Sequence, residues 1–314
     1  MKSSMNSKTR TIRNLIIFVV GVVGLPWLGW ALDMGRGADP HNQQNSLGWL
    51  LFILSPLLVS LLLRAVGGDG WKDLGIKPAL KGNGKWYALS ILFHPVITIA
   101  ILVAGFTLGM VLIPDLSSAK LTLVGQAIVL AILPALVKNI FEEFGWRGYL
   151  APKIQLVVRN PLVGHVLVGI VWFAWHLPYY VVLLDPSTIR SVTSMGLAVF
   201  LPLTLAGLVA AAIVYGEIRL LTGSIWPAVL MHVVGNVLIG ALIEQKFFSM
   251  LGGTDVFMSP GWSSAISIVL FATIGLWLYR RRTKSMSATT QPSDAAPTIG
   301  LGNVAPSATV LPPR

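Results

Sequence analysis

The chain alternates long apolar runs with short polar connections. Each run has about 20 residues, the length that an α-helix needs to cross the hydrocarbon core of a bilayer. A transmembrane barrel would instead show segments of about ten residues with alternating polarity. The pattern therefore predicts an all-α fold, a polytopic transmembrane helical bundle with about eight transmembrane helices. We place these helices near residues 14–32, 47–66, 86–113, 121–143, 162–184, 192–215, 224–243 and 263–280.

The domain organisation follows from where the apolar pattern ends. We predict one transmembrane domain at residues 1–283. Residues 284–314 are rich in Ser, Thr, Ala and Pro and lack a periodic apolar pattern, which is typical of a disordered tail. Within the transmembrane domain, the third run is long enough to tilt, or to break at His94-Pro95.

Composition and charge agree with a membrane protein. Charged residues make up 11% of the chain, against about 25% in a soluble domain. The net charge is +11. When successive connections between the helices are assigned to opposite sides of the membrane, most of the Lys and Arg residues fall on the same side. By the positive-inside rule, both termini and the tail are cytoplasmic. We therefore expect the lipid bilayer as a partner and no nucleic acid. The absence of cysteine excludes disulfides, thiolate metal sites and a cysteine nucleophile.

Two adjacent glutamates, Glu142 and Glu143, end the fourth run. An ionisable group at membrane depth costs about 2.5–3.5 kcal/mol and points to a functional site. Glu143 and Arg147 have the spacing of a helical ion pair. Glu142 is rotated about the helix axis by about 100° from Glu143, and Lys138 lies four residues before Glu142. In one interpretation Arg147 anchors Glu143 and Glu142 faces an interior cavity. In the other, both glutamates end the helix in water.

Histidines within the other runs supply further candidate residues. His176 lies in the fifth run, and His232 and Asn236, four residues apart in the seventh, share a helical face. We predict structural roles for His94 and His165.

These residues are compatible with two kinds of chemistry. Glu142, His176, His232 and Asn236 supply a general base, a partner imidazole and donors for a developing oxyanion, which suffice to activate water. Glu142, His176 and His232 could equally bind zinc, although no HExxH pair places two histidines on one helix.

Three segments carry a family resemblance: EEFGWRGYL, WFAWHLP and SIWPAVLMHVVGN. Together they resemble the CAAX-protease and bacteriocin-processing family of intramembrane endopeptidases, also called the Abi or CPBP family. Its pattern is EExxxR, FxxxH and HxxxN on successive membrane helices. Trp172 stands where the second motif has phenylalanine, which affects packing more than chemistry. The resemblance covers roughly residues 125–243.

The resemblance implies a function and a role for each residue. Glu142 would activate water with help from His176, and His232 and Asn236 would stabilise the oxyanion during peptide hydrolysis, while Glu143 and Arg147 orient the site. The substrate would be a membrane-anchored or lipidated protein or peptide, no cofactor is expected, and zinc is the alternative. We expect a multi-pass protein of a bacterial plasma membrane. The competing hypotheses are a catalytically silent scaffold or bacteriocin-immunity-type binding protein of the same family, and a transporter.

The depth of the glutamates needs an explanation. His176 lies about 22 Å into a helix that begins near Pro161, at about 1.5 Å per residue, whereas Glu142 stands near the predicted cytoplasmic surface. Either the helix before His176 starts later, or the fourth helix extends past Arg147 and buries Glu142. We favour the second, because Phe144, Trp146, Tyr149 and Leu150 continue an apolar helical pattern.

Overall fold

The computed structural model describes residues 2–290, and the side chains of residues 7–190 and 193–285. Its elements are α1 (Lys2–Gly35), α2 (Leu47–Ala65), α3 (Gly84–Thr107), β1 (Val111–Leu112), α4 (Ser118–Gly145), η1 (Trp146–Leu150), α5 (Ala151–Val157), α6 (Pro161–Pro178), η2 (Tyr179–Leu183), α7 (Pro186–Val192), α8 (Leu197–Thr222), α9 (Trp226–Glu244), β2 (Ser249–Met250), α10 (Asp255–Met258) and α11 (Ala265–Thr290). The elements η1 and η2 are π-helical turns.

The predicted polytopic helical bundle is confirmed. In the described part of the chain, seven helical segments are long and apolar enough to cross a membrane: Ser7–Gly35, Leu47–Ala65, Gly84–Thr107, Ser118–Val157, Pro161–Leu183, Leu197–Thr222 and Trp226–Glu244. The eighth predicted helix is present as α11, but it is not among these seven. Its apolar part, 265–279, is about 22 Å long, shorter than the roughly 30 Å of a bilayer core, because Arg280, Arg281 and Arg282 follow.

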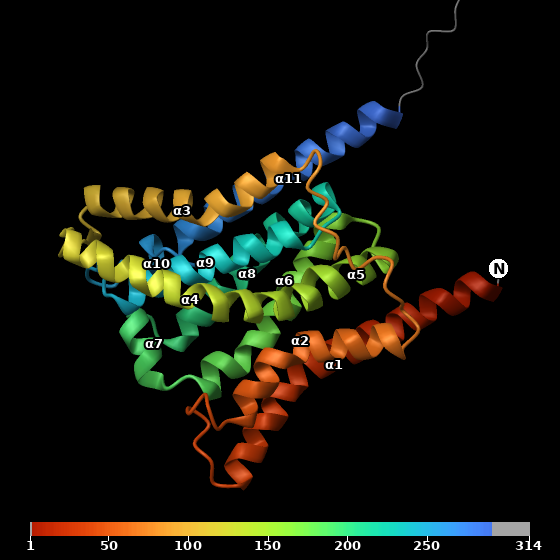
Figure 1. The fold of residues 1–314 in the computed structure, drawn as a ribbon, viewed down its shortest axis with the longest axis horizontal. Coiled ribbons are helices and arrows are strands. Elements are labelled where there is room, and N and C mark those ends of the chain that lie inside the picture. Colours follow the sequence, from red (N-terminus) through yellow and green to blue (C-terminus); the bar gives the residue numbers. More distant parts are fainter. Residues whose placement is uncertain (1, 291–314) are drawn as a thin grey trace, which may run out of the picture.

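The two ends of the described chain lie on the same side of the bundle. In Figure 1 the start of α1 and the end of α11 are both on the right. This is the arrangement that two cytoplasmic termini require, and their cytoplasmic location stays a prediction.

Several predicted boundaries differ from the structure. Of the two alternatives for the third run, a tilted helix or a break at His94-Pro95, the break is excluded, because α3 runs without interruption through Pro95. This helix ends at Thr107 rather than at 113, and Gly109 follows with φ +69°, the left-handed conformation that ends helices. The sixth membrane helix is α8, displaced towards the C-terminus by the short helix α7.

The predicted tail also begins later than expected. Helix α11 continues to Thr290, seven residues beyond the predicted end of the membrane domain at 283. The rest of the predicted tail, residues 291–314, lies outside the described residues.

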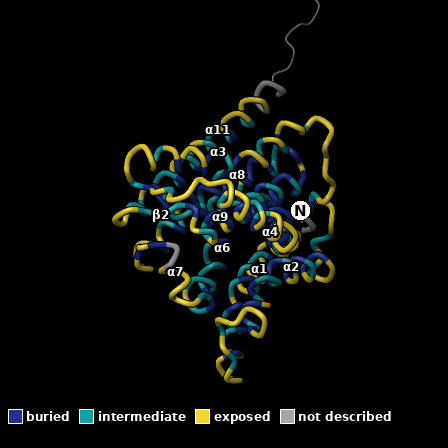
Figure 2. The backbone as a smooth tube through the Cα atoms, turned by 60° about the vertical axis from the view of Figure 1, so that its left-hand side comes forward, coloured by how far each residue is buried: buried dark blue, intermediate teal, exposed yellow. Residues whose placement is uncertain are grey.

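Helix α8 occupies the centre of the bundle. It packs against α6 and α11, while α9 packs against α3 and α4. Small residues allow the close contact between α6 and α8: a Cβ added at Gly169 would lie 2.6 Å from the Cα of Val209. Figure 2 shows the buried backbone in the middle of the bundle, around α8 and α9, and exposed backbone mainly in the connections and at the rim.

The outer face of α4 is suited to lipid. Val129, Leu130 and Leu133 are 69%, 78% and 68% exposed. Large apolar side chains that point outward from a membrane-spanning helix contact lipid rather than water. These residues therefore mark the surface that faces acyl chains.

The connection between α2 and α3 is fixed by ion pairs. Asp73 contacts Nη1 of Arg64 at 2.7 Å and Nζ of Lys153 at 2.9 Å. These contacts attach the connection to α2 and α5, next to the segment that contains the glutamate pair.

Candidate active site

The fourth membrane helix continues past the glutamate pair, as predicted. Helix α4 leads directly into the π-helical turn η1 and then into α5, so one helical segment runs from Ser118 to Val157. Glu142, Glu143 and Arg147 are fully buried as a result. The alternative in which both glutamates end the helix in water is therefore wrong.

Both π-helical turns adjoin candidate residues. The turn η1 begins three residues after Glu143 and contains Arg147, and η2 begins three residues after His176. Such turns are rare and often occur at functional sites, because the extra residue changes which side chains face the same way. Their positions single out these two segments independently of the motifs.

Glu143 links two helices through one carboxylate oxygen. Its Oε1 accepts hydrogen bonds from Nη1 of Arg147 at 2.9 Å and from Nδ1 of His232, on α9, at 2.9 Å. The predicted ion pair between Glu143 and Arg147 is thus present. The guanidinium of Arg147 also lies 4.5 Å from the ring centroid of Trp172 and 4.6 Å from that of Tyr215, a cation–π arrangement that favours a buried cation.

Glu142 is held by two donors: Lys138, which lies outside the three motifs, and Trp172, which stands at the first position of the second motif. Nζ of Lys138 contacts its Oε1 at 2.6 Å, and Nε1 of Trp172 donates to its Oε2 at 3.4 Å. Nε2 of His232 lies 3.9 Å from the same Oε2. Each of the two buried carboxylates therefore has its own cation, Lys138 beside Glu142 and Arg147 beside Glu143.

His176 approaches the site from the last turn of α6. Its Nδ1 donates a hydrogen bond to the backbone oxygen of Trp172 at 2.9 Å, which fixes the proton on Nδ1 and leaves Nε2 as the acceptor of the neutral ring. Among the hydrogen bonds of the described residues, none joins His176 to Glu142. The predicted assistance of Glu142 by His176 has no direct contact in this arrangement.

Four candidate side chains line one cavity. It has a volume of about 380 Å³ and is lined by Lys138, His176, His232 and Asn236 together with apolar and aromatic residues. The predicted shared face of His232 and Asn236 is confirmed, because both lie on this cavity. Glu142 itself is fully buried and does not line the cavity, whereas Lys138, whose side chain is 34% exposed, lines the cavity and contacts Oε1 of Glu142.

Sequence reasoning missed Asn139 and underestimated Trp172. Asn139 is fully buried and accepts a hydrogen bond from Nδ2 of Asn236 at 3.0 Å. Its position three residues before Glu142 on a helix was a usable signal. Trp172 differs from the phenylalanine of the motif in having an N–H group, and this is the group that reaches Glu142.

The remaining histidines have structural partners. His94 is hydrogen-bonded to the Tyr215 hydroxyl through Nε2 at 3.2 Å, and Nε2 of His165 donates to Oε1 of Glu217 at 3.0 Å. Both histidines are buried. These contacts agree with the structural roles predicted for them.

The residues do not fit the zinc alternative in this arrangement. Within the described residues, no group of three or more His, Asp or Glu side chains is placed to hold a metal ion. In addition, Oε1 of Glu142 is occupied by the Lys138 ammonium at 2.6 Å. The expectation that no cofactor is needed stays a prediction.

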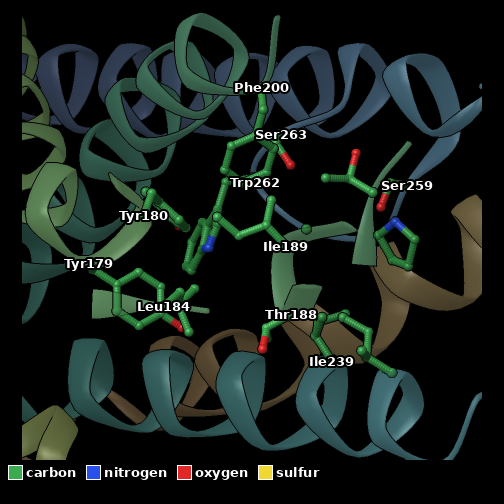
Figure 3. Close-up of a pocket in the computed structure, with 14 residues that line it drawn as sticks. Tyr179, Tyr180, Leu184, Thr188, Ile189, Phe200, Ile239, Ser259, Trp262 and Ser263 are labelled. Atoms are coloured by element: carbon green, nitrogen blue, oxygen red, sulfur yellow. The ribbon is translucent and has the colours of Figure 1, made fainter. Parts of the chain in front are cut away.

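An apolar pocket adjoins the cavity (Figure 3). It has a volume of about 250 Å³, and it shares Tyr179, Tyr180 and Trp262 with the cavity that contains His176. Its other lining residues include Phe200 and Ile239. This pocket therefore offers a mainly apolar surface next to the candidate catalytic residues.

Comparison with known protein families finds a match for one region of the chain. Residues 124–238 match the family model described as "Type II CAAX prenyl endopeptidase Rce1-like". The match includes every candidate catalytic and orienting residue named above and leaves out α1, α2 and α3. No curated protein matches the chain.

Proposed function

We propose that this chain, whose residues 124–238 form an Rce1-like CAAX endopeptidase domain, is an intramembrane endopeptidase. It hydrolyses a peptide bond of a membrane-anchored or lipidated protein or peptide. The observation that carries the proposal is the position of Glu142, a fully buried carboxylate beside a cavity lined by His176, His232 and Asn236. Burying a carboxylate at membrane depth costs free energy, and a role as general base would explain why the chain has one here.

The chemistry needs only the protein's own side chains and water. Glu142 removes a proton from a water molecule while the water oxygen bonds to the carbonyl carbon of the scissile peptide. The resulting oxyanion accepts hydrogen bonds from Nδ2 of Asn236 and from Nε2 of His232, which carries a proton there in the imidazolium form of the ring, since its Nδ1 donates to Glu143. When the C–N bond breaks, the proton passes to the departing amine, so that hydrolysis ends with a carboxylic acid and an amine.

The surrounding groups prepare Glu142 for this step. Lys138 and Trp172 hold one carboxylate oxygen each, which restricts rotation of the side chain. Glu143 and Arg147 orient His232, because His232 donates to the oxygen that also binds Arg147.

A second function is favoured by the enclosure of Glu142. Its side chain has no exposed surface, and the Lys138 ammonium contacts its Oε1. A catalytically silent member of the family would bind the same lipidated peptide in the cavity without cleaving it.

One experiment separates these two functions. Purified full-length protein in liposomes is mixed with a library of lipid-anchored peptides, and both binding and cleavage are measured. An endopeptidase cleaves at least one bound peptide, and Glu142→Gln still binds it without cleaving. Binding of peptides by the wild type with no cleavage of any would identify the silent relative. Cleavage that survives Glu142→Gln would contradict the proposed mechanism.

A further inference from the structure

A basic groove lies at one end of the bundle and is lined by none of the motif residues. It has a volume of about 690 Å³. We define it by its lining residues, which are Lys85, Trp86, Gln155, Pro161, Leu220, Leu221, Arg281, Arg282 and Ser285. None of these residues is acidic, and three carry a positive charge.

The charges of the groove are only partly compensated. Arg282 is paired with Glu217, with Nε 2.6 Å from Oε2 and Nη2 3.0 Å from Oε1. Lys85 and Arg281 take part in none of the ion pairs found among the described residues. They lie instead beside Trp86, with Nζ of Lys85 and Cζ of Arg281 5.2 Å and 5.6 Å from its ring centroid. The groove therefore has an excess of two positive charges.

The groove lies at the level where membrane helices meet water. Lys85 and Trp86 begin α3, Pro161 begins α6, and Leu221 lies one residue before the end of α8. Figure 1 shows the beginning of α3 beside the later part of α11, towards the side where both ends of the described chain lie. Tryptophan and basic residues at helix ends are typical of the lipid headgroup region.

We infer that the basic groove binds the phosphate of an acidic phospholipid. Lys85 and Arg281 supply the cations, as basic pockets between membrane helices do for acidic headgroups. Trp86, Leu220 and Leu221 provide an apolar surface for the glycerol and the first acyl carbons. Free phosphate shares the ionic chemistry but would make no use of this apolar surface, so we assign the site to the lipid.

Binding of this lipid would also fix α11 in place. Helix α11 supplies Arg281 and Arg282, while Lys85 comes from α3 and Pro161 from α6. A phosphate held between them bridges elements that are otherwise joined at this end by the buried contacts of Glu217 with Arg282 and His165. The site uses no residue of the candidate active site, so it is independent of the proposed function.

The test compares lipids and variants in full-length protein purified in a neutral detergent. The probes are phosphatidylglycerol, phosphatidylcholine with the same acyl chains, and inorganic phosphate. The variants are Lys85→Gln/Arg281→Gln and, as the matched control, Lys77→Gln/Lys81→Gln, which removes two exposed positive charges from the connection between α2 and α3. Lipid binding is measured by native mass spectrometry and by the shift in unfolding temperature.

We expect phosphatidylglycerol to bind and stabilise the wild type and the control alike. The groove variant should bind it about 30-fold more weakly, which corresponds to about 2 kcal/mol for two cations near an acidic headgroup. A charge-conserving variant, Lys85→Arg/Arg281→Lys, should keep most of the affinity.

Three results would overturn the inference. The first is wild-type affinity for phosphatidylglycerol in the groove variant. The second is equal stabilisation by phosphatidylcholine. The third is a full shift with inorganic phosphate alone, which would assign the groove to a free anion. If the groove variant does not fold, loss of binding in the charge-conserving variant, with its fold intact, would contradict the role of the two charges.

Discussion

Replacement of Arg147 by alanine should destabilise the protein more than it changes the chemistry of the site. The substitution removes the guanidinium from a fully buried pair and leaves Glu143 without its closest cation. Breaking a buried pair from one side costs about 3–5 kcal/mol. The cation–π contacts with Trp172 and Tyr215 are lost as well. Because His232 still donates to Glu143, we expect the lower part of that range, about 3 kcal/mol.

A double-mutant cycle measures this coupling. Free energies of unfolding in mixed micelles are compared for the wild type, Arg147→Met, Glu143→Gln and the double variant. The double variant should be more stable than Arg147→Met by about 2 kcal/mol or more, because no uncompensated buried charge remains. The reasoning would be refuted by Arg147→Ala or Arg147→Met with wild-type stability. If activity disappeared while stability was unchanged, Arg147 would contact the substrate instead.

Three further predictions concern the base, the connection between α2 and α3, and the topology. Lys138→Met should slow cleavage by about 10- to 100-fold, because a charge-assisted hydrogen bond to Glu142 is worth about 1.5–3 kcal/mol. Asp73→Asn should destabilise the protein at neutral pH, with the difference from the wild type shrinking as the pH falls below about 4. Single cysteines at Lys8 and Lys246 should react with an impermeant maleimide from opposite sides of the membrane, Lys8 from the cytoplasmic side, since the chain has no cysteine of its own.

The controls for these predictions come from the same chain. Lys120→Met places the same substitution at the other end of α4 and should leave cleavage unchanged. For Asp73, burial acts to raise its pKa, but hydrogen bonds from Lys153 and Arg64 outweigh it and leave the pKa below its usual value. A carboxylate with a lowered folded-state pKa stabilises the fold above its unfolded pKa and loses this effect in acid. The role of Asp73 would be contradicted if the stability difference between Asp73→Asn and the wild type grew in acid. The topology would be contradicted if both cysteines were labelled from the same side of the membrane.

Local spacing was enough to predict part of the fold and of the candidate site. The ion pair of Glu143 with Arg147 and the shared face of His232 and Asn236 depend only on helical periodicity. The continuation of the fourth helix was visible in the apolar residues after Arg147. At His94-Pro95 the sequence did not decide between a tilted and a broken helix, and the helix continues because the missing hydrogen bond of one proline is tolerated within a packed membrane helix.

Other features depended on contacts between helices that spacing does not encode. The Trp172 indole reaches Glu142 only because α6 brings it beside α4. The Tyr215 ring lies beside the Arg147 guanidinium only because α8 packs next to η1. The enclosure of Glu142 by Lys138 was equally inaccessible, since a spacing of four residues predicts a contact but not which side of the carboxylate is left open.

The central claim is that Glu142 is the base that activates water, and single-turnover cleavage tests it most directly. Glu142→Gln keeps the shape of the side chain and removes the base, while Glu244→Gln makes the same change at an exposed position at the end of α9. With a lipid-anchored peptide that the wild type cleaves, Glu142→Gln should lose about 10²- to 10⁴-fold in rate with unchanged peptide affinity, and Glu244→Gln should match the wild type. A Glu142→Gln variant that cleaves within a few-fold of the wild-type rate would contradict the account.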